Sequence, residues 1–154
     1  MRILFVLAIV LVAAPLFAAG GGGAPKDKTM PGAATPDSRY TDGVQRAKAQ
    51  QWSEAEVAFR DATMQRPKFP EAWNGLGHAL KMQGKYGEAL KAYDEALRQR
   101  PDYPEAIEYL GEAYVGMGRP DDARTQLARL KPLDGKLADR LERTIAAGKP
   151  DPTW

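Results

Sequence analysis

One arrangement of hydrophobic, small and polar positions recurs along the chain at a constant spacing, which we call the repeat interval. The middle copy comprises Gly77, Ala89, Tyr93, Ala96 and Pro101. The positions one interval earlier hold matching residues, namely Gly43, Ala55, Phe59, Ala62 and Pro67. The positions one interval later match at Leu110, Gly111, Ala123 and Leu127, and diverge where Pro101 becomes Gly135. The pattern therefore predicts three consecutive repeats, over residues 36–69, 70–103 and 104–137.

Each repeat is predicted to hold two antiparallel helices. Pro67 and Pro101 are expected to end the second helices, because proline lacks the backbone donor and clashes with the preceding turn. Helices of about thirteen residues are marginally stable in water by themselves, so their stability has to come from packing against one another. Leu137, Leu141 and Ile145 lie four residues apart and predict one more helix, over residues 137–147, that caps the last repeat.

The recurring glycines are expected to let the two helices of each repeat approach closely. Phe59, Tyr93 and Leu127, each sixteen residues after its glycine, are expected to fill the space beyond the glycine. Trp52 and Tyr86 are also one repeat interval apart and are expected to close the turn between the two helices of a repeat.

The anchors of the middle repeat resemble a known family. Trp73 is followed by the pair Leu76-Gly77 and by Leu80, and Gly84 then precedes the second helix with Tyr93. This order closely resembles the tetratricopeptide repeat (TPR), which has a 34-residue period. The three units cover about two-thirds of the chain. The resemblance implies an all-α fold, a right-handed α-solenoid of three TPR helix pairs plus a C-terminal capping helix, within residues 37–147.

The first 19 residues have the order of a secretory signal peptide. Arg2 supplies the positive charge, an uncharged apolar run begins at Ile3, and Ala18 and Ala19 are the small residues at its end. The alternative is an uncleaved inner-membrane anchor through residues 3–19, because the run nearly reaches the ~20 apolar residues that a spanning helix needs. Either form exports the rest of the chain, which in a bacterium means the periplasm or cell surface.

Residues 20–36 contain four consecutive glycines and three prolines, a composition that predicts a flexible linker. Residues 148–154 are expected to form a C-terminal tail that is loose or folded back on the repeats.

The amino-acid composition excludes several kinds of site and partner. The chain has 22 Lys+Arg and 20 Asp+Glu residues, and this balance shows no bias toward nucleic acid, so none is expected as a partner. It has no cysteine, which excludes disulfides and zinc-thiolate sites. His78 is the one imidazole, and without a second histidine we interpret it as a groove-facing or surface residue. No catalytic motif is present, so we expect no enzyme activity, no metal and no cofactor.

The resemblance implies that a partner would contact the first helix of each repeat, on the concave side of the solenoid. The candidate contact residues are Tyr40, Val44, Ala47, Glu71, Asn74, His78, Lys81, Glu105, Glu108 and Glu112. The N-terminal end of this surface would be apolar and aromatic, and its C-terminal end acidic. A peptide or helix with an apolar stretch and basic residues would complement it. The alternative is that these charges belong to ordinary solvated helix faces.

One family subtype grips a C-terminal carboxylate with a clamp of Lys, Asn and Arg residues. The corresponding positions here hold Tyr40, Val44, Gly75, Glu105 and Tyr109, and none of them matches. The leading hypothesis is therefore a non-enzymatic protein-interaction module of the cell envelope, acting as adaptor or scaffold, whose partner the sequence does not name. The alternative is a structural protein that self-associates through the ends of the solenoid. Reversing Glu105, Glu108 and Glu112 to Lys is expected to abolish capture without unfolding.

Overall fold

The structure, a computed structural model, describes residues 34–150. The predicted signal peptide or anchor, the predicted linker up to residue 33 and residues 151–154 of the tail lie outside the described residues. Among the helices that the structure describes, none is both long enough and apolar enough to cross a lipid bilayer.

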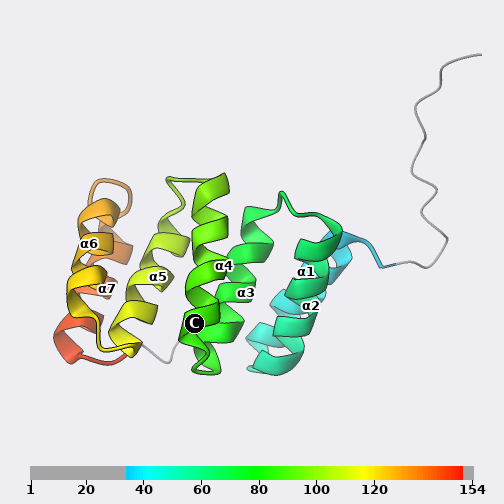
Figure 1. The fold of residues 1–154 in the computed structure, drawn as a ribbon, viewed down its shortest axis with the longest axis horizontal. Coiled ribbons are helices and arrows are strands. Elements are labelled where there is room, and N and C mark those ends of the chain that lie inside the picture. Colours follow the sequence, from blue (N-terminus) through cyan, green and yellow to red (C-terminus); the bar gives the residue numbers. More distant parts are fainter. Residues whose placement is uncertain (1–33, 151–154) are drawn as a thin grey trace, which may run out of the picture. The chain divides into compact units, whose positions relative to one another are not determined.

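Residues 34–150 form seven helices that follow one another in a row (Figure 1). Each helix contacts the next one along the chain, and contacts also join α1 to α3, α3 to α5 and α5 to α7. The predicted all-α arrangement of helix pairs followed by a capping helix is therefore confirmed. The helices are α1 (Pro36–Lys48), α2 (Trp52–Gln65), α3 (Pro70–Met82), α4 (Tyr86–Gln99), α5 (Pro104–Gly116), α6 (Pro120–Leu130) and α7 (Gly135–Ala147). We call the surface formed by α1, α3 and α5 the first-helix face.

Prolines define both ends of the helix pairs. Pro36, Pro70 and Pro104 begin α1, α3 and α5, where the first N–H groups have no partner within the helix and a proline costs no hydrogen bond. The second helices α2 and α4 each end two residues before a proline, Pro67 and Pro101 respectively, as predicted.

The turns inside the helix pairs share a left-handed residue. Gln50, Gly84 and Gly118 are equivalent positions of the three repeats and have φ angles of 57°, 73° and 69°. Glycine adopts this conformation without a steric cost, whereas a residue with a β-carbon is strained there. In the first repeat Gln50 adopts this conformation, although its β-carbon makes it less suitable for the turn than glycine.

Aromatic rings of the second helices lie directly on glycines of the first helices. Phe59 of α2 packs between Gly43 of α1 and Gly75 of α3, where an added β-carbon would lie within 2.7 Å of its ring. Tyr93 of α4 covers Gly77, where the corresponding distance is 2.6 Å. Both rings are buried. The glycines thus make room for a ring of the paired helix, and Phe59 also joins the first repeat to the second.

The third repeat differs from the sequence-based expectation. The side chain nearest to a β-carbon added at Gly111 is Leu141 of α7, at 2.6 Å, and not Leu127. The capping helix also begins at Gly135, two residues earlier than predicted. The reason is local, because the Asp134 side chain accepts hydrogen bonds from two backbone N–H groups and so forms the N-cap. The cap therefore supplies a core residue as well as a polar end.

Trp52 and Tyr86 contact the first helix of the following repeat. The Trp52 ring lies edge-on to the ring of His78 in α3, with centroids 5.5 Å apart. Tyr86 packs on Gly116 of α5, where an added β-carbon would lie 2.5 Å from the ring. The expectation that these residues only close a turn was too narrow, since they hold successive repeats together.

The first helix pair carries polar residues where the second pair carries apolar ones. Arg39, Asp42 and Arg46 occupy the positions that hold Trp73, Leu76 and Leu80 one repeat later. Arg46 pairs with Asp42 at 2.9 Å, and Arg39 pairs with Asp61 of α2 at 3.1 Å. The hydrophobic stacking surface is thus replaced by ion pairs at the α1 end of the row.

Gly77→Ala is expected to destabilise the fold, because the new methyl group would overlap the buried Tyr93 ring. Overpacking costs roughly 1–3 kcal/mol, against the ~1 kcal/mol that alanine gains over glycine in a helix. Gly87→Ala in α4 is the matched control, since nothing lies within 4 Å of its β-carbon. The control should unfold at the same or a higher urea concentration than the parent chain. Equal urea midpoints for the two variants would contradict the packing described here.

Candidate functional site

A cavity of about 150 Å³ opens on the first-helix face. Seven of the ten predicted contact residues line it, together with three residues outside that set. The predicted residues are Tyr40, Val44, Ala47, Glu71, Asn74, His78 and Glu105, and the additional ones are Phe59, Gly75 and Tyr109. Side chains that are far apart in sequence thus meet because α1, α3 and α5 lie next to one another.

Two of the three additional residues were within reach of the sequence. Gly75 and Tyr109 occupy positions of the carboxylate clamp, and all five clamp positions line this cavity. Phe59 comes from the second helix α2, and it reaches the cavity because Gly43 and Gly75 leave room for its ring. A pattern restricted to first helices could not find it.

Four of the ten residues that line the cavity carry aromatic rings, namely Tyr40, Phe59, His78 and Tyr109. The Tyr40 ring is tilted against Phe59, with centroids 5.8 Å apart, and against Phe69, with centroids 5.1 Å apart. His78 also stacks at a tilt on Tyr109, with centroids 4.7 Å apart. Such walls offer flat apolar area with few rotatable bonds, which suits the burial of an apolar side chain.

His78 is a buried residue of this wall, with 2% of its surface exposed. Burial, together with the positive charges of Lys81 and Arg140, lowers the pKa of its imidazole to about 3. The alternative interpretation of His78 as a surface residue was therefore wrong. An imidazole that stays neutral across the physiological range contributes aromatic packing here rather than charge.

Asn74 also lines the cavity and is 9% exposed. Its Oδ1 atom is buried and has no hydrogen-bond partner among residues 34–150. A buried polar atom without a partner is costly, so it marks a position where a bound group could supply the missing donor.

Lys81, Glu108 and Glu112 do not line the cavity, and each of these buried side chains takes part in an ion pair. Lys81 of α3 pairs with Glu112 of α5, and both side chains are almost fully buried. Glu108 of α5 pairs with Arg140 of α7 through both carboxylate oxygens. Burial raises the pKa of Glu108, and the ion pair with Arg140 opposes this shift. The ion pairs therefore connect α3, α5 and α7.

These pairs correct the predicted surface. The sequence pattern suggested an acidic C-terminal end of the groove, but Glu108 and Glu112 are neutralised inside the protein and only Glu105 is exposed. Reversing all three to Lys would bury unpaired cations beside Lys81 and Arg140. That variant is expected to unfold rather than to report on binding.

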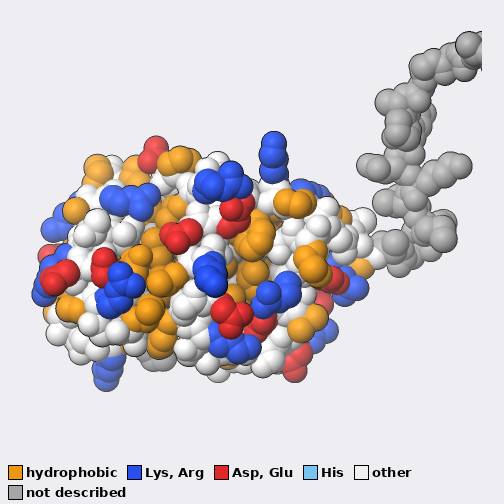
Figure 2. Space-filling model, in the orientation of Figure 1, with side chains coloured by type: hydrophobic (Ala, Val, Ile, Leu, Met, Phe, Trp, Pro, Cys, Tyr) orange, Lys and Arg blue, Asp and Glu red, His pale blue; other side chains and the backbone are white. Residues whose placement is uncertain are grey.

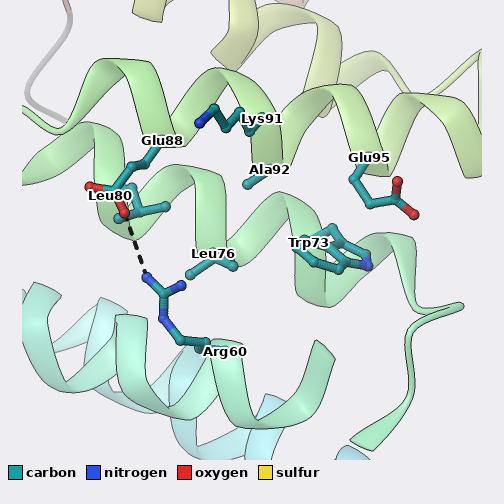
Figure 3. Close-up of a pocket in the computed structure, with 8 residues that line it drawn as sticks. All are labelled: Arg60, Trp73, Leu76, Leu80, Glu88, Lys91, Ala92 and Glu95. Atoms are coloured by element: carbon teal, nitrogen blue, oxygen red, sulfur yellow. Dashed lines mark ion pairs between the residues drawn. The ribbon is translucent and has the colours of Figure 1, made fainter. Parts of the chain in front are cut away.

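A second hollow lies in a crevice between α2 and α4, with residues of α3 at its base (Figure 3). Its base is formed by Trp73, Leu76 and Leu80, and Arg60 faces Glu88 across it at 3.8 Å. Its rim also carries charges of both signs. Figure 2 shows the same mixture on one face of the helical array, where hydrophobic side chains lie between basic and acidic ones. This crevice has the features of an ordinary boundary between repeats.

The described part of the chain contains no group of three or more His, Cys, Asp or Glu side chains that could hold a metal ion. What the geometry provides is an aromatic cavity with one unpartnered amide and carboxylates at its edge. Stacked helix pairs with a cavity on the first-helix face define the class of the protein as a helical-repeat protein.

Comparison with protein families gives the particular family. Two family models described as tetratricopeptide repeat match the chain, one over residues 43–104 and the other over residues 80–142. The chain is a tetratricopeptide repeat protein with about three helix pairs and a capping helix. No curated protein sequence matches it.

Solved structures with the same fold are distant in sequence. The TPR2B domain of yeast Sti1, in its pHsp70 complex, has a TM-score of 0.69 and 15% identity over 74% of this chain and 98% of that one. The SycD chaperone of Yersinia enterocolitica, in complex with a peptide of the translocator YopD, has a TM-score of 0.67 and 16% identity over 73% and 90%. The first TPR domain of Spaghetti (RPAP3), bound to the HSP90 peptide SRMEEVD, has a TM-score of 0.68 and 17% identity over 73% and 91%.

Removing one partner of the Lys81–Glu112 pair is expected to be strongly destabilising. Lys81→Met leaves the Glu112 carboxylate buried without a cation, which should cost about 3–5 kcal/mol. Adding Glu112→Leu removes that charge too, so the double variant should recover most of the lost stability. Urea unfolding of the two single variants and the double variant measures the coupling. Additive losses would contradict the burial of this pair.

The imidazole of His78 is expected to stay neutral between pH 8 and pH 5. As the pH falls, the unfolded chain takes up a proton near pH 6.5 and the folded chain only near pH 3. The stability that neutral His78 contributes is therefore complete above pH 6.5 and is lost as the pH falls toward 3. Because the chain has one histidine, its ring signals can be followed by NMR without assignment. A midpoint near 6.5 in the folded protein would contradict the burial.

Proposed function

We propose that this chain is a non-enzymatic binding module that holds a segment of a protein partner against the first-helix face. The observation that carries the proposal is the aromatic cavity itself. It brings together Tyr40, Val44 and Tyr109 from α1 and α5, and it contains the unpartnered amide oxygen of Asn74. Apolar walls with a few placed polar groups are the usual composition of a recognition site.

Structures of the same fold support a peptide as the occupant. The SycD and RPAP3 structures are complexes with peptides. By analogy, a partner segment would insert an apolar side chain between the rings of the cavity and lay its backbone along α1, α3 and α5. A peptide captured in this way needs no chemistry from the protein, which agrees with the proposed role as adaptor or scaffold.

The carboxylate clamp is not part of the proposal. Its five positions line the cavity, but they hold an aromatic, an aliphatic, a glycine, an acid and another aromatic residue. None of them offers a positive charge to a peptide's C-terminal carboxylate. The recognition chemistry therefore has to differ from that subtype.

We also propose that the protein works in the cell envelope, in the periplasm or attached to the inner membrane. This proposal rests on the sequence of residues 1–19 alone, with its charged start, apolar run and small residues.

Self-association is the second candidate function. It is favoured by Val57 and Met64, two apolar side chains of α2 that are 67% and 66% exposed. It is opposed by the ion pairs of Arg39 and Arg46, which place charge at the α1 end, where a second copy would have to stack. Stacking would desolvate these charges without a matching gain in apolar area.

Val44→Trp is expected to reduce partner capture at least about fivefold, because the indole ring of the new side chain would occupy the cavity that receives the partner. Val57→Trp is the matched control, since it adds the same group at an exposed position of α2 outside this cavity. In-cell crosslinking of C-terminally tagged protein, followed by mass spectrometry, measures capture for each variant. Equal capture by both variants, with unchanged thermal unfolding, would place the contact elsewhere.

A sizing column at several concentrations separates the two candidate functions. A binding module acting through the cavity should elute as a monomer at all concentrations, and Val57→Trp should not alter its elution. A dimer that grows with concentration, together with crosslinks only between copies, would favour self-association instead.

A further inference from the structure

The first two repeats share an arrangement of three interacting residues at the edge of the first-helix face. An acid in the first turn of the first helix pairs with an arginine at the end of the second helix. The guanidinium of that arginine also lies over the ring of an aromatic residue three positions later, at 4.6 Å in both repeats. The two sets are Asp37, Arg66 and Phe69, and Glu71, Arg100 and Tyr103.

The third repeat keeps the acid and loses the arginine. Glu105 occupies the position of Asp37 and Glu71, but Asp134 stands where Arg66 and Arg100 stand in the earlier repeats. Asp134 is itself occupied as the N-cap of α7. Glu105 is exposed and makes no ion pair with any residue from 34 to 150, so its carboxylate remains available at the cavity edge.

The other charges near the cavity are already matched. The Arg100 guanidinium pairs with Glu71 and stacks on Tyr103, so these charges cancel. Lys81 pairs with Glu112, and the half-buried Arg140 pairs with the buried Glu108. The cavity therefore carries one uncompensated charge from the described residues that line it, and that charge is negative.

Asn74 provides a second, independent indication of a ligand. The residue is more than nine-tenths buried, lines the same cavity, and has a buried Oδ1 atom without a hydrogen-bond partner in the described chain. The unpartnered acceptor of this lining residue and the unpaired carboxylate of Glu105 both lack the same kind of group, a donor N–H.

We propose that the cavity recognises a partner segment in which a lysine or arginine lies next to an apolar side chain. The cation pairs with the Glu105 carboxylate, the apolar side chain packs between Val44 and Tyr109, and an N–H group of the segment donates to Asn74 Oδ1. This inference rests on the proposed function and specifies its partner. It also separates this groove from one that takes an acidic peptide such as SRMEEVD, whose carboxylates Glu105 would repel.

A positional-scanning array of twelve-residue peptides tests the specificity. The array is probed with the purified protein, without its N-terminal segment if that segment is cleaved in the cell. The wild-type protein should enrich peptides with Lys or Arg beside an aliphatic or aromatic residue. Glu105→Lys should shift the selection at the cationic position to Asp or Glu. Glu54→Lys is the matched control, because Glu54 is also an exposed acid in the first turn of a helix, α2, and lies outside the cavity.

Affinities of one enriched peptide then give the size of the effect. Glu105→Gln should weaken its binding about two- to fivefold, which corresponds to one exposed ion pair, and raised salt should reduce the difference. Glu105→Lys should weaken it more, while Glu54→Lys should bind as the parent does. Asn74→Leu should weaken even a peptide in which norleucine replaces the lysine.

The outcomes separate the two proposals. Enrichment of acidic peptides, or an unchanged selection by Glu105→Lys, would overturn the cation preference while leaving the peptide-binding function intact, provided that Val44→Trp still weakens selection. Absence of any enriched peptide, or a selection that Val44→Trp leaves unchanged, would overturn the proposed function itself. If Asn74→Leu binds the peptide as tightly as the parent chain does, the Asn74 amide is not part of the binding site.

Discussion

The close packing of a ring on a glycine is the contact on which the rest of this structure depends. Phe59 fills the space between Gly43 and Gly75, and Tyr93 covers Gly77. Because a β-carbon at any of these glycines would lie within 2.7 Å of a ring, the helices can meet at this separation only where the side chain is absent. The same packing brings Phe59 through to the first-helix face, so the contact that holds two repeats together also forms a wall of the cavity.

Buried charge gives the C-terminal half a second set of constraints. Lys81 and Glu112 join α3 to α5, and Glu108 and Arg140 join α5 to α7. Such pairs contribute little net stability over apolar residues of the same size, but a mispaired arrangement would leave a charge buried and uncompensated. The pairs thus define how α7 sits on α5. They also remove from the surface two of the three carboxylates that could have attracted a basic partner.

The fold was predictable in detail because it depends on local spacing. A constant repeat interval, prolines at helix starts and glycines at fixed positions determine where helices begin, end and touch, and each repeat supplies the same signal again. The candidate site was only partly predictable. Seven of ten residues line the cavity, since the resemblance to the tetratricopeptide repeat implies which positions of the first helices share a face, whereas Lys81, Glu108 and Glu112 lie on the same helices but are buried in ion pairs.

The sequence by itself determined that the chain is built of stacked helix pairs with a cap, that Pro67 and Pro101 follow the second helices, and that Phe59 and Tyr93 pack on Gly43 and Gly77. Only the tertiary structure decided which charges are available to a partner. The pairing of Glu108 with Arg140 and of Lys81 with Glu112 joins residues from different repeats whose side chains meet between helices. Whether a side chain is buried and paired depends on this contact between helices. The spacing of hydrophobic residues along one helix therefore does not reveal it. The same is true of Glu105. The loss of its arginine partner can be recognised only after the structure of the first two repeats shows where that arginine would lie.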